Sequence, residues 1–375
     1  MSEIGSVKWK KKDLEHFFPT LKKRVDGYFS GNKIKKQGNR KLYIKAFALL
    51  TIYLTPFILI LTIQLPVFAQ LLLWSLMGFA LAGIGMSVMH DANHGAFSKN
   101  KTLNYFMGHT LNLLGGSVCN WKMQHNVLHH TYTNIANMDE DIDDKLLMRF
   151  CPHSERKGYH RFQFIYVVFF YSILTLYWVT FKDFVQFIQY RKHQTFCEEK
   201  KSNVRKFIQI ISLKAVYFFI ILYLPIGIVG LPVGATIGGF LIMQAIAGFI
   251  LALVFQLAHT VEGTSHPLPN SEGIIENDWA IHQLQTTANF ARKSRWISWY
   301  VGGLNFQVEH HLFPYISHVH YPHIAEIVKE TAEEFGVPYL ENQTFMNAVN
   351  SHFTFLYQLG KPCPVEEEEE EAIRA

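Results

Sequence analysis

Four long apolar segments, grouped in two close pairs, constrain the fold of this chain more than any other feature. Residues 43–64 and 66–89 form the first pair, and residues 207–229 and 232–258 form the second. Each segment is long enough to cross the roughly 30 Å hydrocarbon layer of a membrane as a helix. So few residues separate the members of a pair that each pair is predicted to be a tight hairpin. The sequence therefore predicts an all-α integral membrane protein with four transmembrane helices in two hairpins.

The composition agrees with this interpretation, since 49% of the 375 residues are hydrophobic and only 17% are charged. The amino-terminal segment, residues 1–42, is rich in lysine and arginine, and the positive-inside rule places it in the cytosol. The first hairpin then returns the chain to the cytosolic face. Lys214 interrupts the start of the second hairpin, and its long side chain is expected to reach towards the membrane surface.

Two shorter apolar runs, residues 103–118 and 163–189, need a separate interpretation. The first is too short and too rich in glycine to span well, and the second is followed by many basic residues that belong on the cytosolic side. Both are predicted to be interfacial helices. The alternative, a crossing by residues 163–189, would move every later residue to the opposite side of the membrane.

Residues 43–362 are thus expected to form one membrane domain with a histidine-rich, metal-binding cap in the cytosol. Residues 363–375 contain the run Glu366 to Glu371 and are predicted to be an acidic, disordered tail. The four cysteines lack the paired spacing of a zinc or redox site, and they are expected to be reduced thiols.

Three histidine clusters lie next to the apolar segments. They are His90-Asp-Ala-Asn-His94, His125-Asn-Val-Leu-His129-His130 and Gln307-Val-Glu-His310-His311. Histidine is the commonest metal ligand, and a neutral imidazole offers one lone pair that must be aimed at the ion. Three such clusters on one face of the membrane predict a metal site, and they contain more imidazoles than one structural ion needs.

Helical geometry suggests how the clusters are used. His90 and His94 are four residues apart, so they share one face of a helix and can converge on an ion. His125 and His129 repeat this spacing. His130 points about 100° away from His129, which would let adjacent imidazoles serve two different metals.

Two further residues complete the predicted site. Gln307 precedes His310 and His311 by three and four residues, and it can ligate weakly or hold a water molecule. His259 follows the fourth apolar segment as His90 follows the second, so it is predicted to be a ligand as well. His282 lies in a polar stretch that is assigned to the substrate tunnel or to the groups that support the ligands.

The predicted metal ligands are therefore His90, His94, His125, His129, His130, His259, His310 and His311. Polar neighbours can accept the second ring N–H of a ligand and fix its tautomer, and the candidates for that role are Asp91, Asn93, Asn126 and Asn134. A set of imidazoles suits iron, copper, zinc or nickel, so ligand type alone leaves the metal open.

The order of one H-x-x-x-H, one H-x-x-x-H-H and one Q-x-x-H-H motif around two hairpins resembles the membrane fatty acid desaturases. The resemblance covers nearly the whole chain. The stretch Asn305-Phe-Gln-Val-Glu-His-His-Leu-Phe-Pro314, with glutamine in place of the first histidine of the last motif, is similar to the front-end acyl desaturases. Those enzymes insert a cis double bond between an existing one and the carboxyl end. The resemblance implies a di-iron centre that uses O₂ and two electrons.

Desaturation also explains the layout in chemical terms. An unactivated methylene group offers neither an acidic proton nor an electrophile, so an oxygen-activating metal pair must abstract its hydrogens. The fatty acyl substrate, carried on a membrane lipid or on coenzyme A, is expected to enter an apolar tunnel beneath the histidines. Candidates for the tunnel wall are Trp121, Tyr132 and Trp299.

The expected electron donor follows from one difference between this sequence and the front-end desaturases that it resembles. Many front-end enzymes carry a fused cytochrome b5 domain marked by His-Pro-Gly-Gly, and this motif is not in the sequence. Ferredoxin or a separate cytochrome b5 is therefore the expected electron donor, and the basic pI of about 8.8 would attract either acidic protein. No nucleic acid is expected as a partner.

Two alternatives use the same residues differently. A sphingolipid desaturase or a lipid hydroxylase would share the scaffold and the metal site. A membrane metal transporter or sensor would need ligands along a path through the bilayer, whereas these clusters lie outside the apolar segments.

Overall fold

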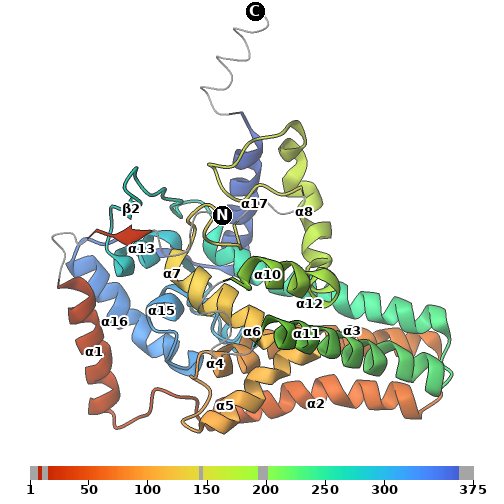
Figure 1. Cartoon of the computed structure of the whole chain (residues 1–375). Helices are drawn as coiled ribbons and strands as arrows, with labels where there is room; N and C mark the ends of the chain where they lie inside the picture. Colours follow the sequence, from red (N-terminus) through yellow and green to blue (C-terminus); the bar gives the residue numbers. More distant parts are fainter. Residues whose placement is uncertain (1–6, 11–15, 143–146, 193–201, 363–375) are drawn as a thin grey trace, which may run out of the picture.

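Four long helical segments form an arm that extends from a cap of shorter elements (Figure 1). The computed structural model describes residues 7–10, 16–142, 147–192 and 202–362. Within these residues, four helical segments are long and apolar enough to cross a membrane, and they are Arg40–Thr62, Val67–Asn93, Asn203–Ile228 and Val233–His259. The predicted fold class, an all-α membrane protein with two hairpins, is confirmed, and the span boundaries agree within a few residues.

Only two of these segments are regular throughout. The first span is α2 (Arg40–Thr62) and the fourth is α12 (Val233–His259). The second consists of α3 (Val67–Gly83), the π-helix η1 (Ile84–Met89) and α4 (His90–Asn93). The third consists of α11 (Asn203–Phe218) and the π-helix η6 (Phe219–Ile228). A π-helix has more residues per turn than an α-helix and changes the direction in which the following side chains point.

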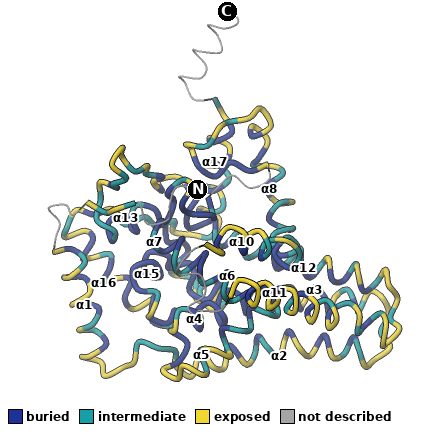
Figure 2. The backbone as a smooth tube through the Cα atoms, viewed as in Figure 1, coloured by how far each residue is buried: buried dark blue, intermediate teal, exposed yellow. Residues whose placement is uncertain are grey.

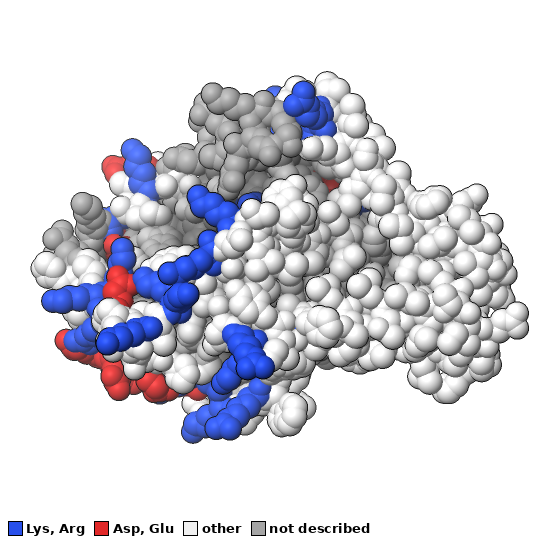
Figure 3. All heavy atoms as spheres, turned by 90° about the horizontal axis from the view of Figure 1, so that it is seen from below, with Lys and Arg blue, Asp and Glu red and all other residues white. Residues whose placement is uncertain are grey.

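Charge and burial separate the arm from the cap. Lysine, arginine and acidic side chains gather over the cap, whereas the surface of the arm carries almost none of them in this view (Figure 3). The arm instead exposes large apolar side chains, such as Phe47 at 74% and Phe68 at 73%. The buried residues concentrate where α4, α7 and α15 meet (Figure 2). An apolar surface of this extent is suited to lipid and not to water, so the protein is membrane-associated.

Close packing joins the second and fourth spans. Gly239 on α12 lies against the ring of Trp74 on α3, and Gly78 on α3 lies against the backbone of Met243. A Cβ atom at either glycine would overlap its neighbour. Small residues at such crossings let helices approach closely, which is the main source of helix association in membranes.

The first predicted interfacial run is a series of short helices. Residues 103–118 cover most of α5 (Lys101–Gly108) and the 3₁₀-helix η2 (His109–Leu114) and end at the start of α6 (Val118–Trp121). The π-helix η3 (Lys122–His129) and α7 (His130–Tyr132) follow. Gly115 ends η2 with a φ of 74°, which favours glycine. This series leads the chain from the first hairpin directly into the second histidine cluster.

The second predicted interfacial run is not one straight helix. It consists of η4 (Gly158–Phe162), α8 (Gln163–Ser172), α9 (Leu174–Tyr177), the π-helix η5 (Trp178–Lys182) and α10 (Asp183–Tyr190). Its two halves meet at an angle of 53°. At the break, a Cβ at Gly248 of α12 would lie only 2.8 Å from the carbonyl oxygen of Tyr171 and 2.9 Å from that of Ser172. The expected continuous helix is therefore wrong, because the backbone bends around α12.

A buried ion pair anchors the second half of this run. Lys214 Nζ lies 2.6 Å from Asp183 Oδ2 and also donates to the carbonyl oxygens of Gly115 and Trp178. The expectation that Lys214 reaches the membrane surface is wrong, since its side chain is buried. A buried charge needs such complete pairing, because water is not available to solvate it.

The cap is built from short helices and two parallel strand pairs. The helices are α1 (Phe17–Gly31), α13 (Trp279–Thr286), α14 (Arg295–Tyr300), α15 (Gln307–Leu312), η7 (His318–His320), α16 (Tyr321–Glu334) and α17 (Phe345–Gly360). The strand β1 (Lys8–Trp9) pairs with β2 (Ile274–Ile275), and β3 (Ala288–Phe290) pairs with β4 (Leu340–Asn342). These pairs tie residues far apart in the sequence to one another.

The basic amino-terminal segment contains a structured helix that the sequence analysis missed. Helix α1 buries Phe17, Leu21, Val25 and Phe29 and packs on α16. Their spacing of four residues was the available signal. Cys151 is buried. Cys119 is disulfide-bonded, so the expectation of reduced thiols is wrong for Cys119. The predicted acidic tail, residues 363–375, lies outside the described residues.

Candidate metal centre

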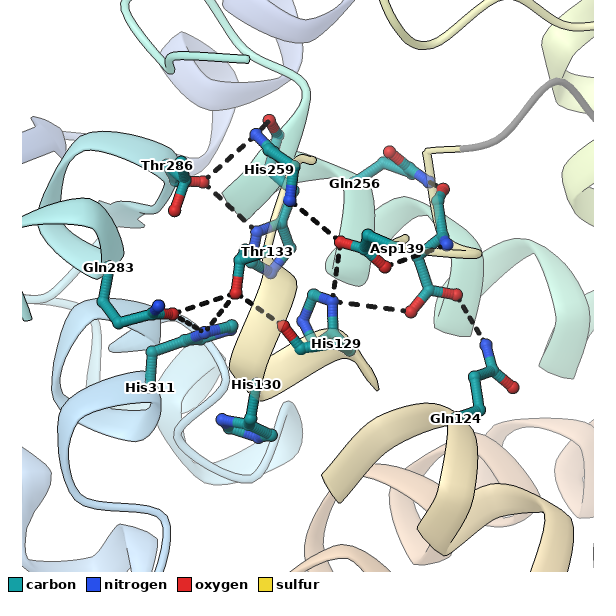
Figure 4. A network of polar contacts seen from close by, with 12 residues as sticks. Gln124, His129, His130, Thr133, Asp139, Gln256, His259, Gln283, Thr286 and His311 are labelled. Carbon is teal, nitrogen blue, oxygen red and sulfur yellow. Dashed lines mark hydrogen bonds and ion pairs between the residues drawn. The ribbon is translucent and has the colours of Figure 1, made fainter. Parts of the chain in front are cut away.

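The eight predicted ligands come from four separate parts of the chain that meet where the arm joins the cap. His90 and His94 lie at the end of the second span, and His259 is the last residue of α12. The second cluster occupies η3 and the start of α7, and the third lies on α15. Figure 4 shows four of these imidazoles, two of them from the second cluster, beside the polar side chains around them.

The ligand nitrogens form two groups. One nitrogen from each of His90, His94, His125 and His310 lies within 4.8 Å of the others. One nitrogen from each of His129, His259 and His311 forms a second group with the same limit. Each group draws on three separate parts of the chain, so the fold and not local sequence brings them together.

His130 lies between the two groups. Its ring centroid is 4.9 Å from that of His94, 4.6 Å from that of His310 and 4.6 Å from that of His311. Neither of its ring nitrogens has a hydrogen-bond partner among the described residues. The intermediate position leaves its lone pair available to an ion in either group.

The pairing within the second cluster differs from the helical arithmetic. His125 and His129 were expected to converge on one ion, but they belong to different groups. The cause is η3, which covers Lys122–His129. In a π-helix the hydrogen bonds run from residue i to i+5, so residues four apart are no longer aligned as they are in an α-helix.

The residues present fit metal ions. Among the described side chains, the Nε2 atoms of His94, His129, His259, His310 and His311 are buried without a hydrogen-bond partner. Buried polar atoms are rarely left unpaired, and several such nitrogens close together form a set that could hold metal ions. Burial lowers the pKa of His94, His125, His130, His310 and His311 well below the usual range. They are therefore neutral, which is the form that binds metal.

Hydrogen bonds fix the other nitrogen of several ligands. His311 Nδ1 lies 2.9 Å from Gln283 Oε1, and His310 Nδ1 lies 3.2 Å from the hydroxyl of Tyr321. His259 Nδ1 lies 3.4 Å from a backbone carbonyl oxygen. These contacts leave each Nε2 atom without a hydrogen-bond partner among the described residues and fix the ring that carries it, as ligand imidazoles require; Figure 4 shows His259 and His311.

His129 has the strongest of these partners. Its Nδ1 atom lies 3.0 Å from Asp139 Oδ2 and 3.6 Å from Asp141 Oδ2. Burial alone would lower the pKa of His129, but the two carboxylates raise it above the usual value. A more basic imidazole is a stronger metal ligand. The sequence signal for Asp139 is the acidic stretch that follows the second cluster.

The four predicted supporting residues bind other groups. Asp91 accepts a hydrogen bond from Ser317 Oγ at 2.7 Å, and Asn93 Nδ2 donates to the carbonyl of Gly108 at 3.2 Å. Asn126 Nδ2 donates to the carbonyl of Asn93 at 3.1 Å. These contacts hold the backbone around the first two clusters, and they do not involve the ligand rings.

Asn134 and His282 also act on the backbone. Asn134 Nδ2 donates to the carbonyl of His259 at 2.9 Å, which holds the end of α12. His282 Nε2 donates to the carbonyl of Thr133 at 2.7 Å. The hydroxyl of Thr133 in turn lies 3.2 Å from His311 Nδ1, so His282 supports a residue that contacts a ligand.

A cavity of about 490 Å³ begins at the first group of ligands. His90, His125 and Gln307 line one part of it, and Gln307 Oε1 is buried without a partner among the described residues. Its other walls are largely apolar and include Met86, Leu114, Trp121, Trp178 and Phe255. Trp121 is thus part of the wall as expected, whereas Tyr132 and Trp299 are not among the lining residues. This shape and composition suit a hydrocarbon chain.

The chain is similar to known desaturases over most of its length. Residues 66–343 match the family model described as fatty acid desaturase. The chain is 35% identical over 344 residues to the sn-1 linoleoyl-lipid 6-desaturase of Arthrospira platensis, covering 92% of each chain. It is 33% identical over 348 residues to the protein of the same name from Synechocystis, covering 92% of this chain and 96% of that one. It is also 35% identical over 366 residues to the acyl-lipid (8-3)-desaturase of Physcomitrium patens, covering 95% of this chain and 75% of that protein.

Proposed function

Because this chain belongs to the fatty acid desaturase family, and is therefore an oxidoreductase, we propose that it inserts a cis double bond into an acyl-lipid at a di-iron centre. The observation that carries the proposal is the pair of imidazole groups at the end of an apolar cavity. The same cavity can hold a hydrocarbon chain and present one of its methylene groups to the metals. We assign this activity to residues 43–362.

The eight histidines are the proposed ligands of two iron ions, one in each group, with His130 between them. Bound iron would supply the oxygen activation that removal of hydrogen from a methylene group requires and that no side chain provides. The protein contributes the geometry. The carboxylate of Asp139 orients His129, and the amide of Gln283 orients His311.

The cavity walls would also keep water away from the metal centre. Apolar side chains around the acyl chain exclude water from the metal centre, which prevents unproductive loss of reactive oxygen species. Gln307 lines the cavity next to the first group, and its unpaired Oε1 can hold a water molecule or ligate weakly. Hydrogen-bonding capacity at this position complements the imidazoles without adding a further strong ligand.

Front-end selectivity is the finer part of the proposal. Two of the similar proteins are named linoleoyl-lipid 6-desaturases, and position 6 lies between the first double bond of a linoleoyl chain and its carboxyl end. Both names specify a lipid-bound acyl group, which favours an acyl-lipid over acyl-CoA as the substrate here. Neither name favours a sphingolipid desaturase or a hydroxylase.

The membrane topology and the redox partner complete the proposal. The chain crosses the membrane several times, and the metal centre faces the cytosol beside the basic amino-terminal segment. Molecular oxygen is the oxidant. Ferredoxin or a separate cytochrome b5 delivers the two electrons, guided by attraction between its acidic surface and the basic cap.

The test is expression of the chain in a host that lacks polyunsaturated lipids, with linoleoyl-lipid and oleoyl-lipid supplied separately. Mass spectrometry of the recovered lipids should locate one new double bond on the carboxyl side of the existing ones. His129→Ala should abolish the product and lower the iron content of the purified protein. Absence of any new double bond, with an active donor present, would refute the proposed reaction.

A further inference from the structure

We infer that His352 is a positioning residue for this reaction, because its two ring nitrogens join the end of the helix that carries His259 to the Tyr171 wall of the cavity. The inference rests on the proposed function, because the two contacts of His352 matter for catalysis only if the protein is a desaturase with this metal centre and cavity. His352 lies on α17, far along the chain from both partners, and it touches neither the ligands nor the cavity. Its effect is therefore on the relative placement of the acyl chain and the metals.

His352 is held in a rigid setting. Its residue exposure is 0%, and α17 is fixed to the rest of the molecule on two sides. Gln163 Nε2 donates to the carbonyl of Leu356 at 2.8 Å, and the backbone N–H of Glu262 donates to Ser351 Oγ at 3.0 Å. The imidazole is thus placed by its helix and not by its own contacts alone.

The two contacts of the imidazole require one tautomer. His352 Nδ1 lies 2.7 Å from the carbonyl oxygen of Thr260, which can only accept, so Nδ1 carries the proton. Nε2 then has a free lone pair and accepts the hydroxyl proton of Tyr171 at 2.8 Å. Burial lowers the pKa of His352 to about 4, so the ring is neutral and both bonds are retained at physiological pH.

The hydrogen bond from His352 to the carbonyl of Thr260 affects the placement of His259 in the metal centre. Thr260 directly follows His259 and terminates α12. Its backbone N–H donates to the carbonyl of Gln256 at 3.0 Å, and its hydroxyl donates to Gln256 Oε1 at 2.6 Å. By binding the carbonyl of Thr260, His352 fixes where the helix ends and hence the direction of the preceding His259 side chain.

The Tyr171 contact acts on the cavity. Tyr171 lies on α8 just before the 53° break and lines the cavity. Its ring stacks on that of His352 with centroids 6.0 Å apart and an interplanar angle of 21°. The hydroxyl bond and the stacking together fix the ring of Tyr171 in the wall. One imidazole therefore sets the spacing between this wall and the end of α12.

Three substitutions separate the two contacts. Tyr171→Phe removes only the hydroxyl group. His352→Asn keeps a donor near the position of Nδ1 for Thr260 but loses the acceptor for Tyr171. His352→Phe loses both contacts and keeps an aromatic ring of similar size. His323→Asn, which changes an exposed histidine of α16, is the matched control.

Each variant of the full-length enzyme is measured with the linoleoyl-lipid for KM, kcat, double-bond position and iron per protein. We expect Tyr171→Phe and His352→Asn to retain iron and to raise KM about threefold to tenfold, the effect of one buried hydrogen bond. The variant that combines Tyr171→Phe with His352→Asn should show no further rise in KM, because both changes remove the same hydrogen bond. His352→Phe should in addition lose at least half of its iron, while His323→Asn should match the wild type.

Two results would overturn the inference. One is wild-type KM and iron content in His352→Phe. The other is a uniform fall in unfolding temperature across the three variants with KM, product position and iron per protein unchanged, which a purely structural role would give. If the wild-type enzyme itself makes no desaturated lipid, the proposed function fails, and the iron content of His352→Phe then tests the Thr260 contact separately.

Discussion

Replacement of Asp139 by asparagine should weaken metal binding by about 10- to 100-fold. The carboxylate accepts three N–H groups in the structure. Oδ2 accepts from His129 Nδ1 at 3.0 Å and from the backbone of Asn134 at 3.0 Å, and Oδ1 accepts from the backbone of Asp141 at 3.0 Å. An amide has a single acceptor oxygen, so at least one of these buried donors loses its partner.

The magnitude follows from two losses. A buried N–H without an acceptor costs about 1–3 kcal/mol, and a hydrogen bond to a charged acceptor is roughly twice as strong as one to a neutral acceptor. In Asp139→Asn the bond to His129 becomes neutral even if its geometry is kept. A 10- to 100-fold loss of affinity corresponds to about 1.4–2.8 kcal/mol, which lies within the range of these two losses.

The assay is a competition between the purified protein in detergent and a chelator of known iron affinity. Iron per protein is followed for the wild type, Asp139→Asn and a charge control, Asp26→Asn. Asp26 binds Lys36 at 2.6 Å near the surface of the cap, so its replacement removes one negative charge away from the ligands. Wild-type iron affinity in Asp139→Asn would refute the proposed role of Asp139, and an equal loss in the control would refute a local cause.

Three further predictions concern the metal and the packing. Chelator-stripped enzyme should regain product formation with Fe(II) but not with Zn(II), which binds imidazoles and undergoes no redox change; activity of the zinc form would refute the redox role. Gly302→Ala should lower the unfolding temperature, because Gly302 has a φ of 65° and its Cβ would overlap the carbonyl of Met86, whereas Gly234→Ala, with open space around it, should not. Lys214→Met should cost about 3–5 kcal/mol of stability by leaving Asp183 buried without its cation; a loss below about 1 kcal/mol, typical of a surface pair, would contradict the buried geometry.

The parts of the fold that depend on the membrane could be predicted from the sequence. The length of a membrane-spanning apolar helix is set by bilayer thickness. The predicted segments 43–64 and 232–258 therefore differ only slightly from the observed helices Arg40–Thr62 and Val233–His259. The bend of residues 158–190 could not be predicted in this way. It arises from a close approach to Gly248, which is a tertiary contact without a local sequence signal.

The candidate metal centre also has parts that could be predicted from the sequence and parts that could not. The candidate ligands could be predicted from chemistry, because histidine in clusters has few other uses, and the structure brings all eight imidazoles together. The supporting residues do not follow from proximity in sequence. Asp139 lies ten residues after His129, and Gln283 lies 28 residues before His311, yet both bind a ligand ring. Asp91 is adjacent to His90 and binds Ser317 instead.

The two pairs of adjacent histidines explain why this arrangement suits two ions and not one. Neighbouring side chains on a helix point about 100° apart, so such a pair diverges instead of closing on a single small ion. His310 belongs to the first group and His311 to the second, as this geometry requires. The other pair is His129 in the second group and His130 between the groups, and the π-helix η3, which ends at His129, turns His125 towards the first group. A regular α-helix at η3 would align His125 with His129 and leave the first group short of an imidazole, so the irregular helix is what allows one short segment to contribute to both groups.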